Sequence, residues 1–266
     1  MNVDRYNTLQ RDLRLKILEL YYKADAGHIG CSLSCIDLLI GSMILNKKKE
    51  EDFILSKGHA ALALYVALNY MGEISDEELN TFYEDGTKLP AHPVEGHFKS
   101  IPFALGSLGH GFPIGAGIAH ANKLNSADSL FTYVLMSDGE TNEGTTWEAM
   151  HFAVMHKLDN LIVMIDKNGL QGFGQTQDIL GDTADGKKWF AAGFDVYEIN
   201  GHDINEIDRT IKTAQSYKNG KPKVLIAHTV KGKGVSYMEN KMEWHYLPMN
   251  ATQLKLARQE VADNYR

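Results

Sequence analysis

Two short apolar runs, separated by about the length of one helix, constrain the fold more than any other feature. Residues 130–136 and 161–165 are apolar almost throughout. A strand that is apolar along its whole length is covered on both faces, as the strands of parallel sheets are. Residues 147–157, between the two runs, have the length and pattern of a helix. The three segments therefore predict a right-handed β-α-β unit.

The rest of the chain alternates in the same way. Apolar residues at helical spacing predict helices over residues 7–23, 34–45, 60–71 and 204–217, and a C-terminal helix over residues 250–266 with Asn250 as its N-cap. Short apolar runs predict further strands over residues 53–56, 196–199 and 224–227. Because no repeat or linker interrupts residues 1–266, we expect a single α/β domain. Its expected architecture is a three-layer α/β/α arrangement around a mainly parallel sheet.

Charge and hydropathy exclude two classes of protein. The net charge is −7, and the densest cationic stretch, residues 47–49, is followed at once by three acidic residues, so we expect no nucleic-acid partner. The longest apolar stretch, residues 36–45, is too short to span a bilayer and contains Asp37. The N-terminus is polar and has no signal-peptide core. We therefore expect no membrane partner and a cytoplasmic location.

The two cysteines, Cys31 and Cys35, lie four positions apart, on one face of a predicted helix. Two ligands are too few for a structural zinc site unless histidines join them. His28 is near in the sequence, so a metal role stays open. Buried free thiols are the favoured interpretation.

Polar residues follow both strands of the central β-α-β unit. Asp138-Gly139 comes directly after the first strand, and Asn168-Gly169 follows the second. Either pair alone is an ordinary turn signal, but the carboxyl ends of neighbouring parallel strands meet at the edge where such sheets bind ligands. Carboxylate and amide oxygens suit Mg²⁺ or Ca²⁺, and one carboxylate leaves positive charge for an anion such as a diphosphate. A backbone carbonyl after Asn168 is a candidate third ligand.

The stretch from Asp138 to Leu170 resembles the thiamine-diphosphate motif. Five further segments, in order along nearly the whole chain, resemble the transketolase family. They are Ala26-Gly27-His28-Ile29-Gly30, Leu55-Ser56-Lys57-Gly58-His59, Leu89-Pro90-Ala91-His92-Pro93, Gly106-Ser107-Leu108-Gly109-His110-Gly111, and Glu143-Gly144 with Trp147-Glu148-Ala149. The resemblance implies the thiamine-diphosphate-binding fold, with thiamine diphosphate and Mg²⁺ (or Ca²⁺) as cofactors.

The resemblance also implies a role for each matching residue. The implied metal ligands are Asp138, Asn168 and the carbonyl of Leu170. The implied cofactor contacts are His59, Gly139, Asn168 and His245 at the diphosphate and Gly106 and Leu108 at the rings. The implied catalytic histidines, which surround the reacting carbon, are His28, His59, His92 and His245. We expect the other histidines to be ordinary surface or core residues; they are His97, His110, His120, His151, His156, His202 and His228.

Two segments near the C-terminus carry weaker signals. His245 is followed by Tyr246, where the family has glycine. Lys231-Gly232-Lys233-Gly234 resembles a loop of two-chain relatives, although such a loop, taken by itself, is most often solvated.

The resemblance implies that this chain forms only one of the two parts that an active enzyme needs. In transketolases the glutamate that activates the cofactor lies in a second, pyrimidine-binding domain, and Glu143 matches a residue at the interface between active sites. We therefore expect an N-terminal subunit that is active only with a C-terminal partner subunit, in an α2β2 assembly. The implied reaction transfers a two-carbon ketol unit from a ketose or its phosphate to an aldose.

Two alternatives stay open. The α subunit of a 2-oxo acid dehydrogenase shares the Asp-Gly and Asn pattern, although we would not expect it to carry the motifs of His28, His59 and His92 together. The other alternative is a non-catalytic, cofactor-binding subunit.

Overall fold

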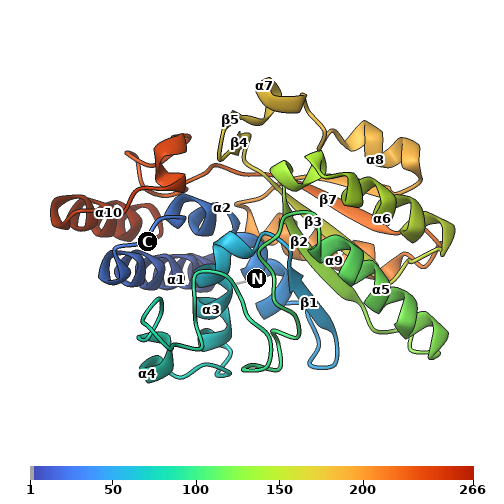
Figure 1. The fold of residues 1–266 in the computed structure, drawn as a ribbon, viewed down its shortest axis with the longest axis horizontal. Coiled ribbons are helices and arrows are strands. Elements are labelled where there is room, and N and C mark those ends of the chain that lie inside the picture. Colours follow the sequence, from blue (N-terminus) through green and yellow to red (C-terminus); the bar gives the residue numbers. More distant parts are fainter. Residues whose placement is uncertain (1–2) are drawn as a thin grey trace.

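The computed structural model describes residues 3–266, which form a sheet covered on both faces by helices (Figure 1). Five parallel strands lie in the order β1-β2-β3-β7-β6. Their bounds are β1 Asp52–Leu55, β2 Thr132–Ser137, β3 Leu161–Lys167, β6 Asp195–Asn200 and β7 Lys223–His228. All five strands predicted from apolar runs are present, and the predicted three-layer α/β/α architecture with a parallel sheet is confirmed.

Helices form the two outer layers. They are α1 Val3–Ala24, α2 Ile29–Leu39, α3 Ala61–Tyr70, α4 Asp76–Leu79, α5 Gly111–Leu124, α6 Gly144–Met155, α7 Thr176–Leu180, α8 Gly186–Ala192, α9 Ile204–Ser216 and α10 Ala251–Asn264. Shorter elements are the π-helical turn η1 Ile40–Ile44, the 3₁₀ turns η2 Gly58–Ala60, η3 Asp138–Asn142 and η4 Met242–His245, and the hairpin β4 Leu170–Gln171 with β5 Gly174–Gln175. Among residues 3–266, no helix combines the length and the apolar character that crossing a bilayer requires.

The central strands are apolar because both of their faces are buried. In β2, Tyr133 and Leu135 belong to the core under α1, α2, α3 and α9, whereas Val134 and Met136 belong to the core under α5, α6 and α8. Successive side chains of a strand point to opposite faces, so a fully apolar run fills both cores. This burial fixes where the strands end, and their ends carry the polar residues of the site.

Helix α2 differs from the predicted helix over residues 34–45. It begins earlier, at Ile29, directly after His28, and it gives way after Leu39 to the π-helical turn η1. Helix α9 packs against this turn, where a Cβ added to Gly41 would lie 2.2 Å from Ile207 Cγ2. The early start matters most, because it places Cys31 in the first turn of the helix.

A buried ion pair joins α1 to α2. Arg14 donates to both carboxylate oxygens of Asp37, at 2.7 and 2.5 Å, and both side chains are fully buried. His202, in the loop after β6, contacts the same carboxylate through Nδ1 at 2.8 Å and accepts from the amide of Val230 through Nε2. The three groups tie the N-terminal helices to the carboxyl edge of the sheet.

Several elements have no counterpart in the sequence prediction, namely α4, α5, α7, α8 and the β4–β5 hairpin. Helix α5 contains Pro113 and three glycines, which weaken any helical signal. Pro113 lies in the first turn, where proline is tolerated. Gly115 lets the helix approach the sheet, because a Cβ there would lie 2.3 Å from Val134 Cγ2.

Candidate active site

The polar residues that follow β2 and β3 lie together at the carboxyl edge of the sheet. Asp138 begins the turn η3, and Asn168 follows β3, which pairs with β2 in the register Ser137–Asp166. The amide of Gly169 donates to Asp138 Oδ2 at 2.8 Å. Asp138 and Asn168 therefore line one pocket at the edge of the sheet where the strand-end argument expects them.

Asp138 is almost completely buried, with 1 % exposure. Its Oδ2 atom accepts from Gly169 and from Thr176 Oγ1 at 2.9 Å, and its Oδ1 atom makes no hydrogen bond with the described residues. Burial, together with the charge of Asp166, raises the pKa of Asp138 to about 6. A carboxylate in this position is stabilised by a cation.

Asn168 is oriented by its neighbours. Its Oδ1 atom accepts from the amide of Leu170 at 3.1 Å, and its Nδ2 atom donates to Asp166 at 3.4 Å. Asp166 is itself paired with Lys57 in the interior. Despite burial, the charge of Lys57 holds the pKa of Asp166 below its usual value. The side-chain amide of Asn168 is thus held in place by a hydrogen bond to a fully buried ion pair.

The donor atoms at this edge fit a hard divalent cation. They comprise a carboxylate oxygen of Asp138 without a hydrogen bond, the amide oxygen of Asn168, and the nearby backbone of Leu170. Within residues 3–266 no three or more His, Cys, Asp or Glu side chains gather in a way that could hold a metal ion. A cation held only by these atoms keeps most of its charge, and therefore needs an anionic ligand.

The four predicted histidines converge from four separate segments. The ring of His28 lies 5.8 Å from that of His59, 5.8 Å from that of His92 and 5.1 Å from that of His245, measured between centroids. The rings of His59 and His245 stack at 5.5 Å. This grouping joins residues that are far apart in the chain, as the sequence motifs predicted.

Burial keeps these imidazoles neutral. It lowers the pKa values of His28, His59 and His245 to about 4, with contributions from neighbouring positive charges, and it also lowers the pKa of His92. Neutral imidazoles can donate and accept hydrogen bonds and move protons near pH 7.

His28 has an unusual backbone. Its φ angle is 72°, in the left-handed region, and its amide donates to the carbonyl of His245 at 3.0 Å. This conformation is uncommon for residues other than glycine, although histidine is among the enriched exceptions. The bend immediately precedes α2 and turns the His28 ring toward the other three.

Lys231 is a buried cation without an anionic partner. Its side chain is 1 % exposed, and its ammonium makes a single hydrogen bond, to His245 Nδ1 at 2.8 Å. Within the described part of the chain no carboxylate pairs with it, yet it lines the same pocket as Asp138. Lys231 is therefore not solvated, as a Lys-Gly-Lys-Gly loop taken by itself most often is. The backbone explains the difference: Gly232 has φ 79°, and a Cβ there would lie 2.7 Å from Met238.

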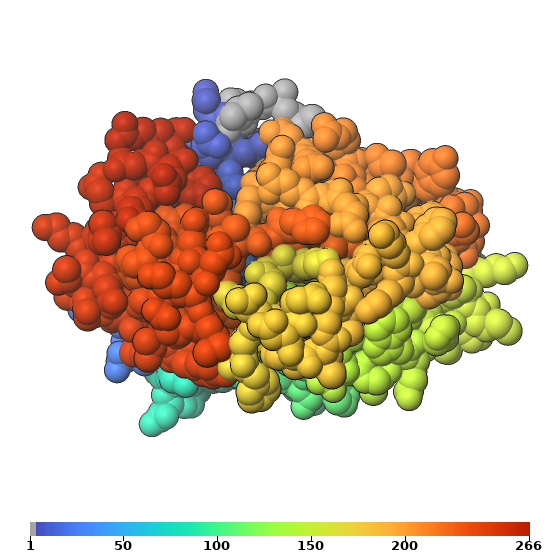
Figure 2. Space-filling model, turned by 90° about the horizontal axis from the view of Figure 1, so that it is seen from above, coloured from blue at the N-terminus to red at the C-terminus, as the bar shows by residue number. Residues whose placement is uncertain are grey.

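Lys231, Asp138 and several other residues of the site line one pocket of about 290 Å³. Predicted site residues that line it are Leu108, Asp138, Gly139, Glu143, Asn168, Leu170, His59 and His245. His28, His92 and Gly106 do not line this pocket; Gly106 lies against His92, which a Cβ would approach to 3.4 Å. Figure 2 views the molecule from the side where β4, β5 and α7 lie, with the orange-red segment around η4 bordering the yellow hairpin.

The border between η4 and the hairpin is formed by Tyr246. Its hydroxyl donates to the carbonyl of Gly172 at 2.6 Å, and its ring lies 4.8 Å from that of His245. Where the family carries glycine, this chain therefore has a side chain that ties the η4 segment to the β4–β5 hairpin. A second cavity, of about 140 Å³, lies beside Tyr246, His28 and His245.

Glu140 is a positioning residue that sequence reasoning missed. It is fully buried, and its carboxylate accepts from the amides of Ser137 at 2.8 Å and Gly109 at 3.2 Å and from the hydroxyl of Ser56. Through these bonds the turn η3, which carries Asp138, is attached to the loops that contain Ser56 and Gly109. The available signal was the capping box that Ser137 and Glu140 form at the start of η3.

The remaining histidines and the cysteines lie as the general rules predict. None of the other seven histidines lines the 290 Å³ pocket or stacks on the four rings. Both cysteines are free and buried. Cys31 nevertheless lines the pocket, beside Lys231.

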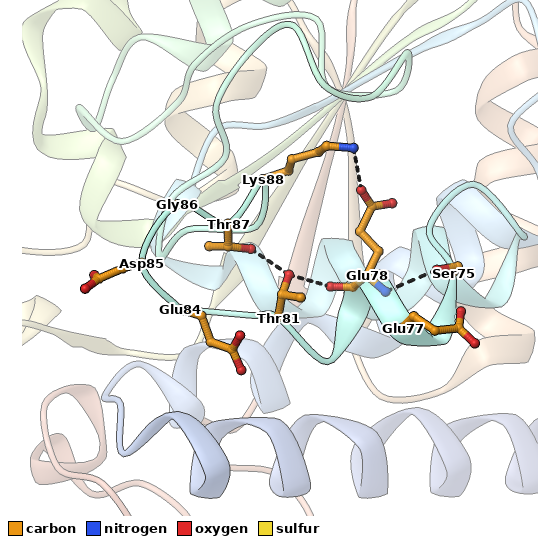
Figure 3. Close-up of a pocket in the computed structure, with 9 residues that line it drawn as sticks. All are labelled: Ser75, Glu77, Glu78, Thr81, Glu84, Asp85, Gly86, Thr87 and Lys88. Carbon is orange, nitrogen blue, oxygen red and sulfur yellow. Dashed lines mark hydrogen bonds and ion pairs between the residues drawn. The ribbon is translucent and has the colours of Figure 1, made fainter.

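A larger hollow of about 600 Å³ lies elsewhere, around α4 (Figure 3). Its polar groups mostly satisfy one another. Lys88 pairs with Glu78 at 2.9 Å, Ser75 caps the amide of Glu78, and Thr81 bonds Thr87 at 2.7 Å. None of the predicted site residues lines this hollow, so size alone does not identify the functional site.

Comparisons with known proteins agree with this geometry. Residues 7–265 match the family described as transketolase, thiamine diphosphate binding domain. An apulose-4-phosphate transketolase subunit of Phocaeicola vulgatus is 41% identical over 99% of this chain and 96% of its own length. The 6-deoxy-6-sulfo-D-fructose transketolase subunit SqwG of a Clostridium species is 34% identical, over 94% and 93%.

Solved structures give the same likeness in three dimensions. The transketolase of Campylobacter jejuni superposes with a TM-score of 0.84 at 28% identity, over 98% of this chain and 43% of that one. The Leishmania mexicana enzyme superposes with a TM-score of 0.86 at 24% identity, over 98% and 41%. The chain thus spans less than half the length of these solved transketolases, whereas it spans nearly all of the two relatives that are named as transketolase subunits.

Proposed function

This chain belongs to the transketolase family, as a thiamine-diphosphate-binding domain of that family, and from this we propose that it is the cofactor-holding subunit of a two-chain transketolase. The reaction would move a two-carbon ketol unit from a ketose, or its phosphate, to an aldose. Subunits named for a transketolase reaction match nearly the whole chain, which favours this function over the α subunit of a 2-oxo acid dehydrogenase and over a non-catalytic subunit.

The observation that carries the proposal is the buried ammonium of Lys231, which has no carboxylate partner among the described residues, in a pocket that also contains Asp138 and Asn168. A buried charge without a partner is costly, so the site is complete only with an anion. The unpaired oxygen of Asp138 supports a cation in the same pocket. A diphosphate bound with Mg²⁺ would satisfy both groups.

We assign the metal to Asp138, Asn168 and the Leu170 carbonyl. The diphosphate would contact His59, His245, Gly139 and Lys231, with Asn168 holding its metal. A Cβ at Gly139 would fall 3.4 Å from Gln171, so glycine leaves the pocket open beside Asp138. Leu108 and Gly106 would lie against the rings of the cofactor.

Bound thiamine diphosphate supplies the carbon nucleophile for breaking and forming the bond next to the substrate carbonyl. The histidines act on the substrate around it. Because His28, His59, His92 and His245 are neutral and close together, they can bond the substrate hydroxyls and move protons to and from its oxygens.

We further propose that a second chain completes the enzyme. It would carry the pyrimidine-binding domain that full-length transketolases contain, in an α2β2 assembly. Support comes from the relatives that are named as transketolase subunits, of which this chain covers 96% and 98%. Glu143 is exposed at the rim of the pocket, where a partner would contact it. The cytoplasmic location stays a prediction.

Titration with thiamine diphosphate in the presence of Mg²⁺ tests the binding site. We expect Asp138→Ala to abolish metal-dependent binding, because Asp138 is the one charged ligand assigned. Asp178→Ala is the matched control: it removes an exposed carboxylate from α7 and should leave affinity unchanged. Wild-type affinity in Asp138→Ala would refute the metal assignment.

Ketol transfer with and without the partner subunit tests the activity. The pair should transfer the unit from a ketose phosphate to an aldose, and this chain alone should not. Robust turnover by this chain alone would refute the two-chain proposal.

A further inference from the structure

Cys31 and Lys231 contact the same atom in the cofactor pocket. The thiol sulfur of Cys31 lies 3.6 Å from His245 Nδ1, and the ammonium of Lys231 lies 2.8 Å from that same nitrogen. Both residues line the pocket, and both are 1 % exposed. Because no carboxylate within the described residues pairs with Lys231, the thiol is the acidic group placed to balance its charge.

Further features around Cys31 favour the ionised form. It occupies the first turn of the eleven-residue helix α2, whose N-terminal dipole stabilises negative charge. Lys57 donates to its backbone carbonyl at 3.3 Å. The titratable groups that face the thiol are Lys231, His59, His245, Lys57 and Tyr21, with Cys35 on the same helix. Of these groups Lys231 and Lys57 carry a charge near pH 7, and their positive charges favour the thiolate.

We propose that Cys31 is a thiolate paired with Lys231 in the cofactor-free chain, and that it is a modification site at which small electrophiles block the diphosphate. In the reaction the sulfur attacks the electrophilic carbon, the new C–S bond forms as the leaving group departs with its electron pair, and Lys231 loses its counter-charge. The added group then fills part of a pocket of about 290 Å³.

The second cysteine is an internal control. Cys35 lies one turn further along α2, is fully buried and does not line the pocket. Burial raises the pKa of Cys35 to about 12, whereas for Cys31 the positive charges of Lys231 and Lys57 outweigh burial and lower the pKa to about 6.

The first experiment treats the folded full chain with iodoacetamide between pH 5 and pH 9 and maps the alkylated peptides by mass spectrometry. We expect Cys31 to react at least tenfold faster than Cys35, with a rate midpoint well below pH 8.5, and the two rates to converge in urea. Reaction of Cys31 no faster than Cys35, or with an ordinary thiol midpoint, would overturn the proposal.

The second experiment links the thiolate to the cofactor, and this link rests on the proposed function. Saturating thiamine diphosphate with Mg²⁺ should slow alkylation of Cys31 at least tenfold, and alkylated chain should no longer bind the cofactor. In Cys31→Ser, iodoacetamide treatment should not change whatever affinity the variant has.

The two proposals fail in different ways. If the untreated chain binds no thiamine diphosphate, the proposed function is wrong, and the thiolate is still decided by the first experiment. If the chain binds the cofactor while Cys31 reacts at an undiminished rate, the function stands and the modification site does not.

Discussion

At the scale of single residues, the site combines groups that a soluble domain normally avoids burying. Asp138, Lys57, Asp166 and Lys231 are all nearly inaccessible, and only Lys57 and Asp166 pair with each other. Buried charges are stabilised by partners or by bound ions. The two that are left over, one acidic and one basic, define the chemistry of the ligand that the pocket takes.

Lys231 gives the most discriminating residue-level prediction. Lys231→Met should raise the dissociation constant for thiamine diphosphate by about tenfold to a hundredfold, since a hydrogen bond to a charged group is worth about 1.5–3 kcal/mol. The same variant should unfold no more easily than wild type without cofactor, because no carboxylate among the described residues loses a partner and the Cys31 thiol can then stay protonated. Cofactor titration and urea unfolding provide the two measurements.

Lys233→Met is the control for that variant, because Lys233 lies in the same loop and pairs with Glu239 at 3.3 Å, outside the pocket. It should change neither quantity. If Lys231→Met lost stability and kept its affinity, Lys231 would be a structural residue.

The histidines divide into two roles. His59 lines the pocket with Asp138. His92 does not line this pocket, and its ring lies 5.8 Å from that of His28. His59→Ala should therefore raise the cofactor dissociation constant about tenfold or more, while His92→Ala should leave it nearly unchanged and slow turnover about a hundredfold. Cofactor titration and steady-state kinetics of the assembled enzyme test this, and swapped effects would reject our placement of the two rings.

At the scale of elements, the positions of helices depend on contacts between distant segments. The Arg14–Asp37 pair joins α1 to α2 in the interior, and removing one member leaves the other buried and charged. Arg14→Leu should lower the free energy of unfolding by about 3–5 kcal/mol, measured by urea denaturation. Arg11→Leu, on the same helix, breaks only a partly exposed pair with Asp12 and should cost at most about 1 kcal/mol.

The double variant Arg14→Leu with Asp37→Leu should recover most of that loss, because neither charge then remains buried. If Arg14→Leu and Arg11→Leu lowered the free energy of unfolding equally, the buried pair would contribute no more to stability than the partly exposed one.

Elements also show how far the sequence alone could lead. The strands were predictable because burial on both faces leaves an apolar run, and their ends placed Asp138 beside Asn168. Helix α5 was not, because Pro113 and its glycines hide the helical pattern. Lys231 could not be predicted as buried, since its side chain packs against Gly30, where an added Cβ would lie 3.2 Å from Lys231 Cγ. That contact joins segments which no local pattern links.

At the scale of the whole molecule, the four neutral histidines make stability depend on pH. Their pKa values are lowered in the folded chain, to about 4 for His28, His59 and His245, against about 6.5 when unfolded. Between these values the unfolded chain binds more protons, so the free energy of unfolding should fall as pH drops from 6.5 toward 4. The raised pKa values of Asp138, Glu140 and Asp52 act in the opposite direction, but the four histidines outnumber these three carboxyl groups.

Urea denaturation at a series of pH values measures this dependence. His245→Gln should make the fall shallower, and His97→Gln, which changes a residue outside the cluster, should not. Stability that stays level or rises over this range would contradict the neutral state assigned to the four rings.

The left-handed backbone at His28 has a consequence for how this chain can evolve. Glycine adopts a φ of 72° without steric cost, whereas a residue with a Cβ pays up to about 1–2 kcal/mol. A library selected only for folding should therefore drift toward glycine at this position, and one selected for turnover should keep histidine. Position 28 would then show a trade-off between folding stability, which favours glycine, and turnover, which favours histidine.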